Sequence, residues 1–119
     1  MRRLAASMSA VLLLAGCAAS PSGPCGQSAI DLEVTVTQED MTPSALDGCV
    51  DVEVTLQVSS EIDGEFHVHG MGDEVEAELV SGETATLTFT PPTAGQFIIE
   101  VHPEEGEEFE AGVLTVNEP

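Results

Sequence analysis

Residues 50–58 read VDVEVTLQV, in which every second residue from Val50 to Val58 is aliphatic and the residues between them are polar. Residues 30–36, IDLEVTV, repeat this pattern. Because successive side chains of a β-strand point to opposite faces of the sheet, such alternation predicts strands with one buried and one wetted face. The two stretches therefore favour a β-sheet protein over a helical one.

Shorter stretches of the same character follow, separated by turn dipeptides such as Asp63-Gly64 and Ser81-Gly82. The further predicted strands cover residues 65–69, 75–80, 84–90, 96–102 and 111–116. About seven short strands at this spacing predict an all-β fold, an antiparallel Greek-key β-sandwich of two sheets. The one helical prediction is short, residues 42–46, where Thr42 is placed to cap a first turn that contains Pro43.

The start of the chain has the pattern of a bacterial export signal. Two arginines precede an apolar stretch that ends in LAGC, residues 14–17. LAGC resembles the lipobox of bacterial lipoproteins, in which the chain is cut before the cysteine and the cysteine receives a diacylglyceryl group. The resemblance implies a signal peptide over residues 1–16 and a lipid on Cys17, which would anchor an extracytoplasmic protein to the cell membrane. An ordinary cleaved signal with an incidental cysteine is the alternative.

Residues 17–28 are expected to form a flexible tether, because Pro, Gly, Ser and Ala dominate it after the cysteine. The folded domain is then expected to cover residues 29–119. With Cys17 lipidated, Cys25 and Cys49 remain as a pair in an exported chain. The pair predicts a disulfide bond, which would contribute roughly 3 kcal/mol by closing the loop between the two residues. Two free thiols are the alternative.

The charge of the chain is strongly one-sided. It has 22 Asp and Glu residues against 2 Lys and Arg, for a net charge of −20. Both cations, Arg2 and Arg3, lie in the predicted signal peptide, so the mature protein would have no lysine or arginine. The absence of cations excludes non-specific nucleic-acid binding. It also opposes contact between the protein surface and anionic lipids, so the acyl group alone would have to attach the protein to the membrane. It also leaves no cation to hold an oxyanion or a phosphate, and we predict a protein that is not an enzyme.

The region from about Val50 to Val116 resembles the cupredoxins. The likeness is carried by three stretches: FHVHG (66–70), TLTFTPPTAGQF (86–97), and a hairpin from FIIEVHPEE (97–105) to AGVLTV (111–116). It implies a cupredoxin-like sandwich, with the first histidine ligand of a copper site at His67 or His69. In the family a later strand ends in a ligand cysteine, but that position falls on Val101 here.

The family's next histidine and methionine positions fall among the glutamates of residues 104–108. A blue copper site requires the cysteine thiolate. The resemblance therefore implies a degenerate copper site, and it does not extend to electron transfer.

Three histidines and one methionine carry the metal hypothesis. His67, His69 and Met71 alternate in EFHVHGMG, residues 65–72, so we expect them on one face of a strand, where two imidazoles could close around one ion. His102 ends a strand whose cupredoxin counterpart is adjacent, and it would supply a third nitrogen. Imidazole with a thioether suits copper better than zinc or calcium. Solvated histidines on an acidic face are the alternative.

The sequence thus predicts a lipid-anchored, extracytoplasmic, non-enzymatic cupredoxin-like domain that binds copper or another transition metal through an exposed H-x-H pair. The alternative function is a metal-free interaction or structural module of the cell envelope with an acidic surface. Neither hypothesis identifies a protein partner.

Overall fold

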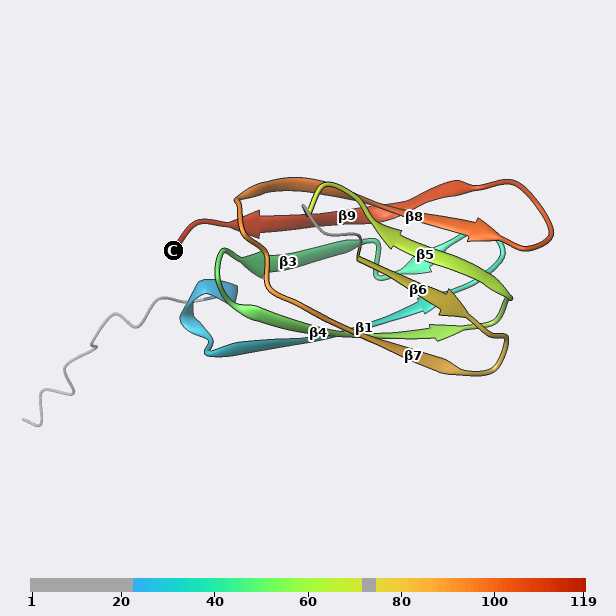
Figure 1. Cartoon of the computed structure of the whole chain (residues 1–119), viewed down its shortest axis with the longest axis horizontal. Coiled ribbons are helices and arrows are strands. Elements are labelled where there is room, and N and C mark those ends of the chain that lie inside the picture. Colours follow the sequence, from blue (N-terminus) through green and yellow to red (C-terminus); the bar gives the residue numbers. More distant parts are fainter. Residues whose placement is uncertain (1–22, 72–74) are drawn as a thin grey trace, which may run out of the picture.

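The computed structural model describes residues 23–71 and 75–119 of the chain. These residues form two facing β-sheets, preceded by one 3-10 turn, η1 (Pro24–Gly26) (Figure 1). The strands are β1 (Ala29–Val36), β2 (Met41–Thr42), β3 (Ala45–Cys49), β4 (Glu53–Ser60), β5 (Gly64–Val68), β6 (Val75–Leu79), β7 (Thr84–Phe89), β8 (Gly95–Pro103) and β9 (Phe109–Asn117). None of the described residues belongs to a helix long and apolar enough to cross a membrane.

One sheet has the strand order β2-β1-β4-β7, and the other has the order β3-β9-β8-β5-β6. Most neighbouring strands are antiparallel, but β1 pairs with β4 and β3 pairs with β9 in parallel. The predicted all-β sandwich is confirmed, and the two parallel pairs correct its purely antiparallel description. Side chains alternate in the same way in both kinds of ladder, so the alternation in the sequence could not give the strand directions.

The core lies between the two sheets and is mainly aliphatic. Val54, Leu56 and Val58, which alternate along β4, are almost completely buried. Phe66 on β5 is fully buried and is the largest side chain of the core. Phe89 and Phe97 pack against this core and are only partly buried. The alternating stretches of the sequence therefore mark the inner face of each strand correctly.

Residues 41–49 form strands β2 and β3, where the sequence predicted a short helix at residues 42–46. Met41 and Thr42 pair with β1, and β3 lies beside β9. Between the two strands, the carbonyl of Ser44 accepts a hydrogen bond of 2.9 Å from the N–H of Val113. The helix prediction is wrong because the backbone groups of this segment are satisfied by other strands rather than by their own neighbours.

Cys25 and Cys49 form the predicted disulfide bond. Cys49 is 1% exposed at the end of β3, and Cys25 of η1 packs against the same core. The bond attaches the last part of the expected tether to the sandwich, so packed structure begins before residue 29. The predicted signal peptide and Cys17 lie outside the described residues.

Candidate metal site

Strands β5 and β8 lie side by side within the five-stranded sheet and bring the site residues together. Their antiparallel register places His67 opposite Glu100 and Phe66 opposite Val101. Phe66 and Val101 are fully buried, so the alternating side chains of His67 and Glu100 point to the outer face. Directly opposed side chains in antiparallel strands have Cβ atoms about 5 Å apart, which is close enough for polar groups to meet.

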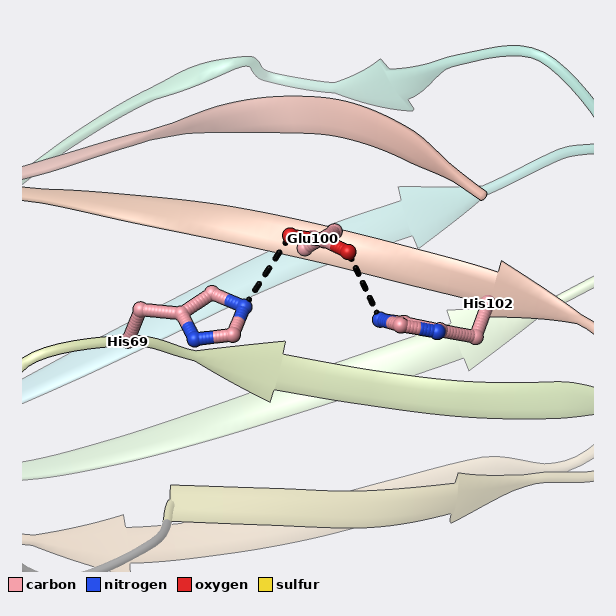
Figure 2. Close-up of side chains that lie close together, drawn as sticks. All are labelled: His69, Glu100 and His102. Carbon is pink, nitrogen blue, oxygen red and sulfur yellow. Dashed lines mark ion pairs between the residues drawn. The ribbon is translucent and has the colours of Figure 1, made fainter. Parts of the chain in front are cut away.

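His69 and His102 reach the same outer face from the two sides of Glu100. His69 follows the last residue of β5, and its N–H donates to the carbonyl of Ile98 at 3.0 Å, which continues the ladder with β8. Its Nε2 lies 3.1 Å from one carboxylate oxygen of Glu100, and Nε2 of His102 lies 2.8 Å from the other (Figure 2). One ligand atom from each of the three residues falls within 4.8 Å of the others. Two imidazoles and a carboxylate thus lie close enough together to be candidate ligands of one ion.

The Nε2 atom of His102 is buried and makes no hydrogen bond within the described residues, although Glu100 is near. The two groups are close, but their relative orientation does not meet hydrogen-bond geometry. Nδ1 of the same ring lies 3.0 Å from Oε2 of Glu108, a residue of the loop between β8 and β9. A carboxylate behind a histidine is the usual support for a ring that binds metal through its other nitrogen. The environment of His102 therefore fits a metal ligand.

His67 lies beside this group but differs from its members. Its Nε2 shares a hydrogen bond of 3.2 Å with Glu65, and its Nδ1 lies 3.3 Å from Glu76. The rings of His67 and His69 are stacked, with centroids 5.9 Å apart and planes 13° apart. A metal ion lies in the plane of an imidazole ligand, so two nearly parallel stacked rings do not point their lone pairs at one ion. The expected H-x-H chelate of His67 and His69 is not the arrangement that forms.

Met71 is the second departure from the sequence prediction. It is 6% exposed and belongs to the core, together with Phe66 and Val68. Gly70, before it, has a φ of 83°, a left-handed conformation that turns the chain away from the strand direction. The period of two that placed Met71 beside the histidines ends at this turn. Met71 therefore supplies no thioether to the outer face.

Glu100 was absent from the sequence-predicted ligands, although it has the central position. Its signal in the sequence is the alternation of Glu100 and His102 in a predicted strand, which places both on one face. Glutamate is so common in this chain that the residue did not stand out. Only the register between β5 and β8 distinguishes Glu100 from the other acidic residues.

The thiolate site of a blue copper protein does not fit these residues. Val101, at the cysteine position of the cupredoxin pattern, is fully buried and points away from the histidines. Both cysteines of the described part of the chain are joined in the disulfide. In the cupredoxin pattern the next histidine and methionine ligands fall among residues 104–108. In this chain those residues include four glutamates, which are exposed in the loop between β8 and β9. The histidine group on the outer face therefore contains no thiolate.

A groove of about 480 Å³ adjoins the site at His102. Four carboxylates contribute to its walls, from Asp63, Glu65, Glu78 and Glu104. A cleft lined by one sign of charge concentrates ions of the opposite sign near it. The approach to His102 is therefore favourable for cations.

No protein-family model matches the chain, and no curated protein matches it. Solved structures share its fold. A copper binding protein studied by NMR in the apo form is 19% identical, with a TM-score of 0.60, over 76% of this chain and 90% of that one. Auracyanin A, a "blue" copper protein from Chloroflexus aurantiacus, is 17% identical, with a TM-score of 0.57, over 74% of this chain and 98% of that one.

A multi-copper oxidase from Pseudomonas thermotolerans is 16% identical, with a TM-score of 0.59, over 76% of this chain and 30% of its own. Identities this low carry the fold and not the activity. The fold of the described domain is cupredoxin-like.

Proposed function

We propose that this protein is a lipid-anchored, extracytoplasmic domain that binds a transition-metal ion through His69, Glu100 and His102. The observation that carries the proposal is the convergence of one ligand atom from each residue within 4.8 Å on the outer face of the sheet. Copper is the first candidate, because Cu(II) binds most tightly among the divalent ions to a given set of nitrogen and oxygen ligands. Copper proteins among the structures of similar fold support the same choice.

The proposed role is binding and not electron transfer or catalysis. A blue copper centre needs a thiolate, and the cysteines at positions 25 and 49 are used in the disulfide. The side chains of the site are partly open to solvent, with 53% exposure for His69 and 35% for His102. An ion held there would exchange with the surroundings more readily than one enclosed in the core. Protons compete with metal for imidazole, so binding should weaken as the pH falls.

The proposed anchor is a lipid on Cys17, and it rests on the sequence LAGC at residues 14–17. The acidic surface would not itself attract an anionic bilayer, so the acyl chains would provide the attachment, at about 0.8 kcal/mol for each buried methylene. A tether after Cys17 would then hold the metal site outside the membrane. The proposed function is thus the capture of a metal ion at the cell surface or in the envelope.

The metal site is tested by titrating the full-length protein, in detergent, with Cu(II). Isothermal titration calorimetry measures the binding. The wild-type protein should bind one ion with a Kd of about micromolar or tighter. The double variant His69→Ala/His102→Ala should lose more than about 100-fold in affinity, because it removes direct ligands, whereas supporting residues alone contribute 10- to 100-fold. Glu107→Gln is the matched control, since Glu107 is exposed in the adjacent loop and contacts none of the three histidines within the described residues.

If the double variant and the wild type bound Cu(II) with equal affinity, the proposed metal site would be wrong. The alternative function, a metal-free interaction or structural module with an acidic face, would then be favoured. The extensive acidic surface is the observation that supports this alternative, since it suits a cationic protein or polymer.

The anchor is tested separately, by mass spectrometry of the membrane fraction. The wild-type protein should carry the mass of acyl chains on a chain that begins at Cys17, and Cys17→Ser should lose both the acyl mass and the membrane attachment. A membrane-bound Cys17→Ser protein of unchanged mass would exclude the lipid anchor. This outcome is independent of metal binding.

A further inference from the structure

The donor atoms on the outer face are two imidazole nitrogens and a carboxylate oxygen, with no sulfur among them. Both methionines of the described part of the chain, Met41 and Met71, are buried in the core, at 4% and 6% exposure. The sulfur atoms of Cys25 and Cys49 are bonded to each other. The soft donors of the described residues are therefore unavailable to an ion at His69, Glu100 and His102.

From this separation we infer that the site prefers Cu(II) to Cu(I), an inference that rests on the proposed metal-binding function. Soft thiolate and thioether ligands select Cu(I), whereas a carboxylate favours the harder divalent ion. The cupredoxin-like fold is thus combined with a ligand set that opposes reduction of the bound copper. The site would hold Cu(II), and it would bind the copper less tightly after a one-electron reductant, such as a thiol in solution that is oxidised to a disulfide, has converted it to Cu(I).

The charges around the site favour the same oxidation state. Glu100 lies between the two ligand rings, and Glu108 lies 3.0 Å from Nδ1 of His102. Glu65 and Glu76 flank the site through their contacts with His67. The Coulomb attraction of a given set of carboxylates is twice as large for a dipositive ion as for a monopositive one. The acidic surroundings therefore add to the preference of the donor atoms.

The coordination shell also has room for the geometry of Cu(II). The three residues supply three donors, and Cu(II) favours a tetragonal arrangement with further nitrogen or oxygen ligands. Because 53% of the His69 side chain is exposed, water can reach the remaining positions. Water at these positions would complete the larger shell of Cu(II), whereas Cu(I) accepts two or three ligands and gains nothing from them.

The experiment compares the affinity of the full-length protein for the two ions. Cu(II) is measured in competition with nitrilotriacetate in air, and Cu(I) is measured in competition with bathocuproine disulfonate under anaerobic reducing conditions. We expect the Kd for Cu(I) to exceed the Kd for Cu(II) by about tenfold or more, because the donor set lacks sulfur. The electron paramagnetic resonance spectrum of the Cu(II) form should show coupling to two imidazole nitrogens.

Three variants make the comparison specific. Glu100→Met places a thioether between the two imidazoles and removes the central charge, so the ratio of the two Kd values should shift toward Cu(I) by tenfold or more, roughly the effect of one good ligand contact. Met71→Leu is a volume-conserving change in the core, and it should leave both Kd values unchanged. Glu107→Met is the control for adding a methionine and removing a charge in the nearby loop.

Tighter binding of Cu(I) than of Cu(II) by the wild type would overturn the inference and leave the metal-binding function in place. A loss of Cu(I) affinity in Met71→Leu would also overturn it, because Met71 would then reach the ion. Failure of both ions to bind would overturn the proposed function, and the inference with it.

Discussion

His67 and His69 are separated by one residue in the sequence, and they differ in what their ring nitrogens contact. Both nitrogens of His67 lie near carboxylates, of Glu65 and Glu76, while His69 contacts the shared carboxylate of Glu100 through Nε2. His67 makes no such contact with Glu100, the residue that joins His69 and His102. The two histidines of the H-x-H motif therefore have different surroundings: His69 belongs to the proposed ligand group around Glu100, and His67 is stacked beside it.

Replacement of each histidine separately tests this difference. His67→Ala should weaken Cu(II) binding by no more than about tenfold, because the stacked pair contributes about 0.5–1.5 kcal/mol. His69→Ala should weaken it by more than about 100-fold, since a direct ligand is lost. Calorimetric titration with Cu(II) gives both values. An equal loss in the two variants would contradict the assignment and restore the pair as a chelate.

At the scale of elements, the site depends on the close approach of β5 and β8. Gly64 begins β5 opposite Pro103, and its φ of 156° favours glycine. A Cβ atom at this position would collide with the carbonyl oxygen of His102 and lie 2.9 Å from the Cα of Pro103. The glycine therefore allows the backbone of β5 to lie against the part of β8 that carries His102.

Gly64→Ala should lower the free energy of unfolding by roughly 1–3 kcal/mol, as an overpacked contact does, and should also weaken Cu(II) binding by separating the two strands. Urea denaturation monitored by circular dichroism measures the first effect. Gly48→Ala in β3 is the control, because the nearest atom to its Cβ would be 3.7 Å away, an ordinary contact. Similar stability of Gly64→Ala and the wild type would show that β5 can move without cost.

The elements also show what alternation in a sequence can predict. The longer strands were predicted from it, since each has one buried and one wetted face. Strands β2 and β3 were missed, because residues 41–49 contain Pro43 and Gly48 and lack a regular alternation. Their strand conformation comes from pairing: β2 turns back onto the nearby β1, and β3 pairs with β9, which is far away in the sequence.

At the scale of the whole molecule, the dominant feature is the net charge of −20. Within the described residues no lysine or arginine balances these carboxylates. Repulsion between the carboxylates opposes the compact state. The folded protein should therefore depend on dissolved cations.

Raising NaCl from 0.1 to 1 M shortens the Debye length from about 10 to about 3 Å, so the repulsion is largely screened. The Tm, measured by differential scanning calorimetry, should rise by about 5 °C or more, which corresponds to roughly 1 kcal/mol for a domain of this size. The triple variant Glu104→Gln/Glu105→Gln/Glu107→Gln should show a smaller rise, because it removes three exposed charges of the same loop. A Tm that does not change with NaCl would exclude a significant contribution from charge repulsion.

The sequence by itself determined the buried face of each long strand, the cysteine pair, the acidic character of the surface and the residue types available to a metal. These properties are local or compositional, so they can be recognised without knowledge of which strands are neighbours. Only the tertiary structure decided that Glu100 joins His69 and His102, that His67 is held by other carboxylates, and that Met71 lies in the core. The reason is that β5 and β8 meet through a register between distant segments, and that the turn at Gly70 ends the alternation from which Met71 had been placed.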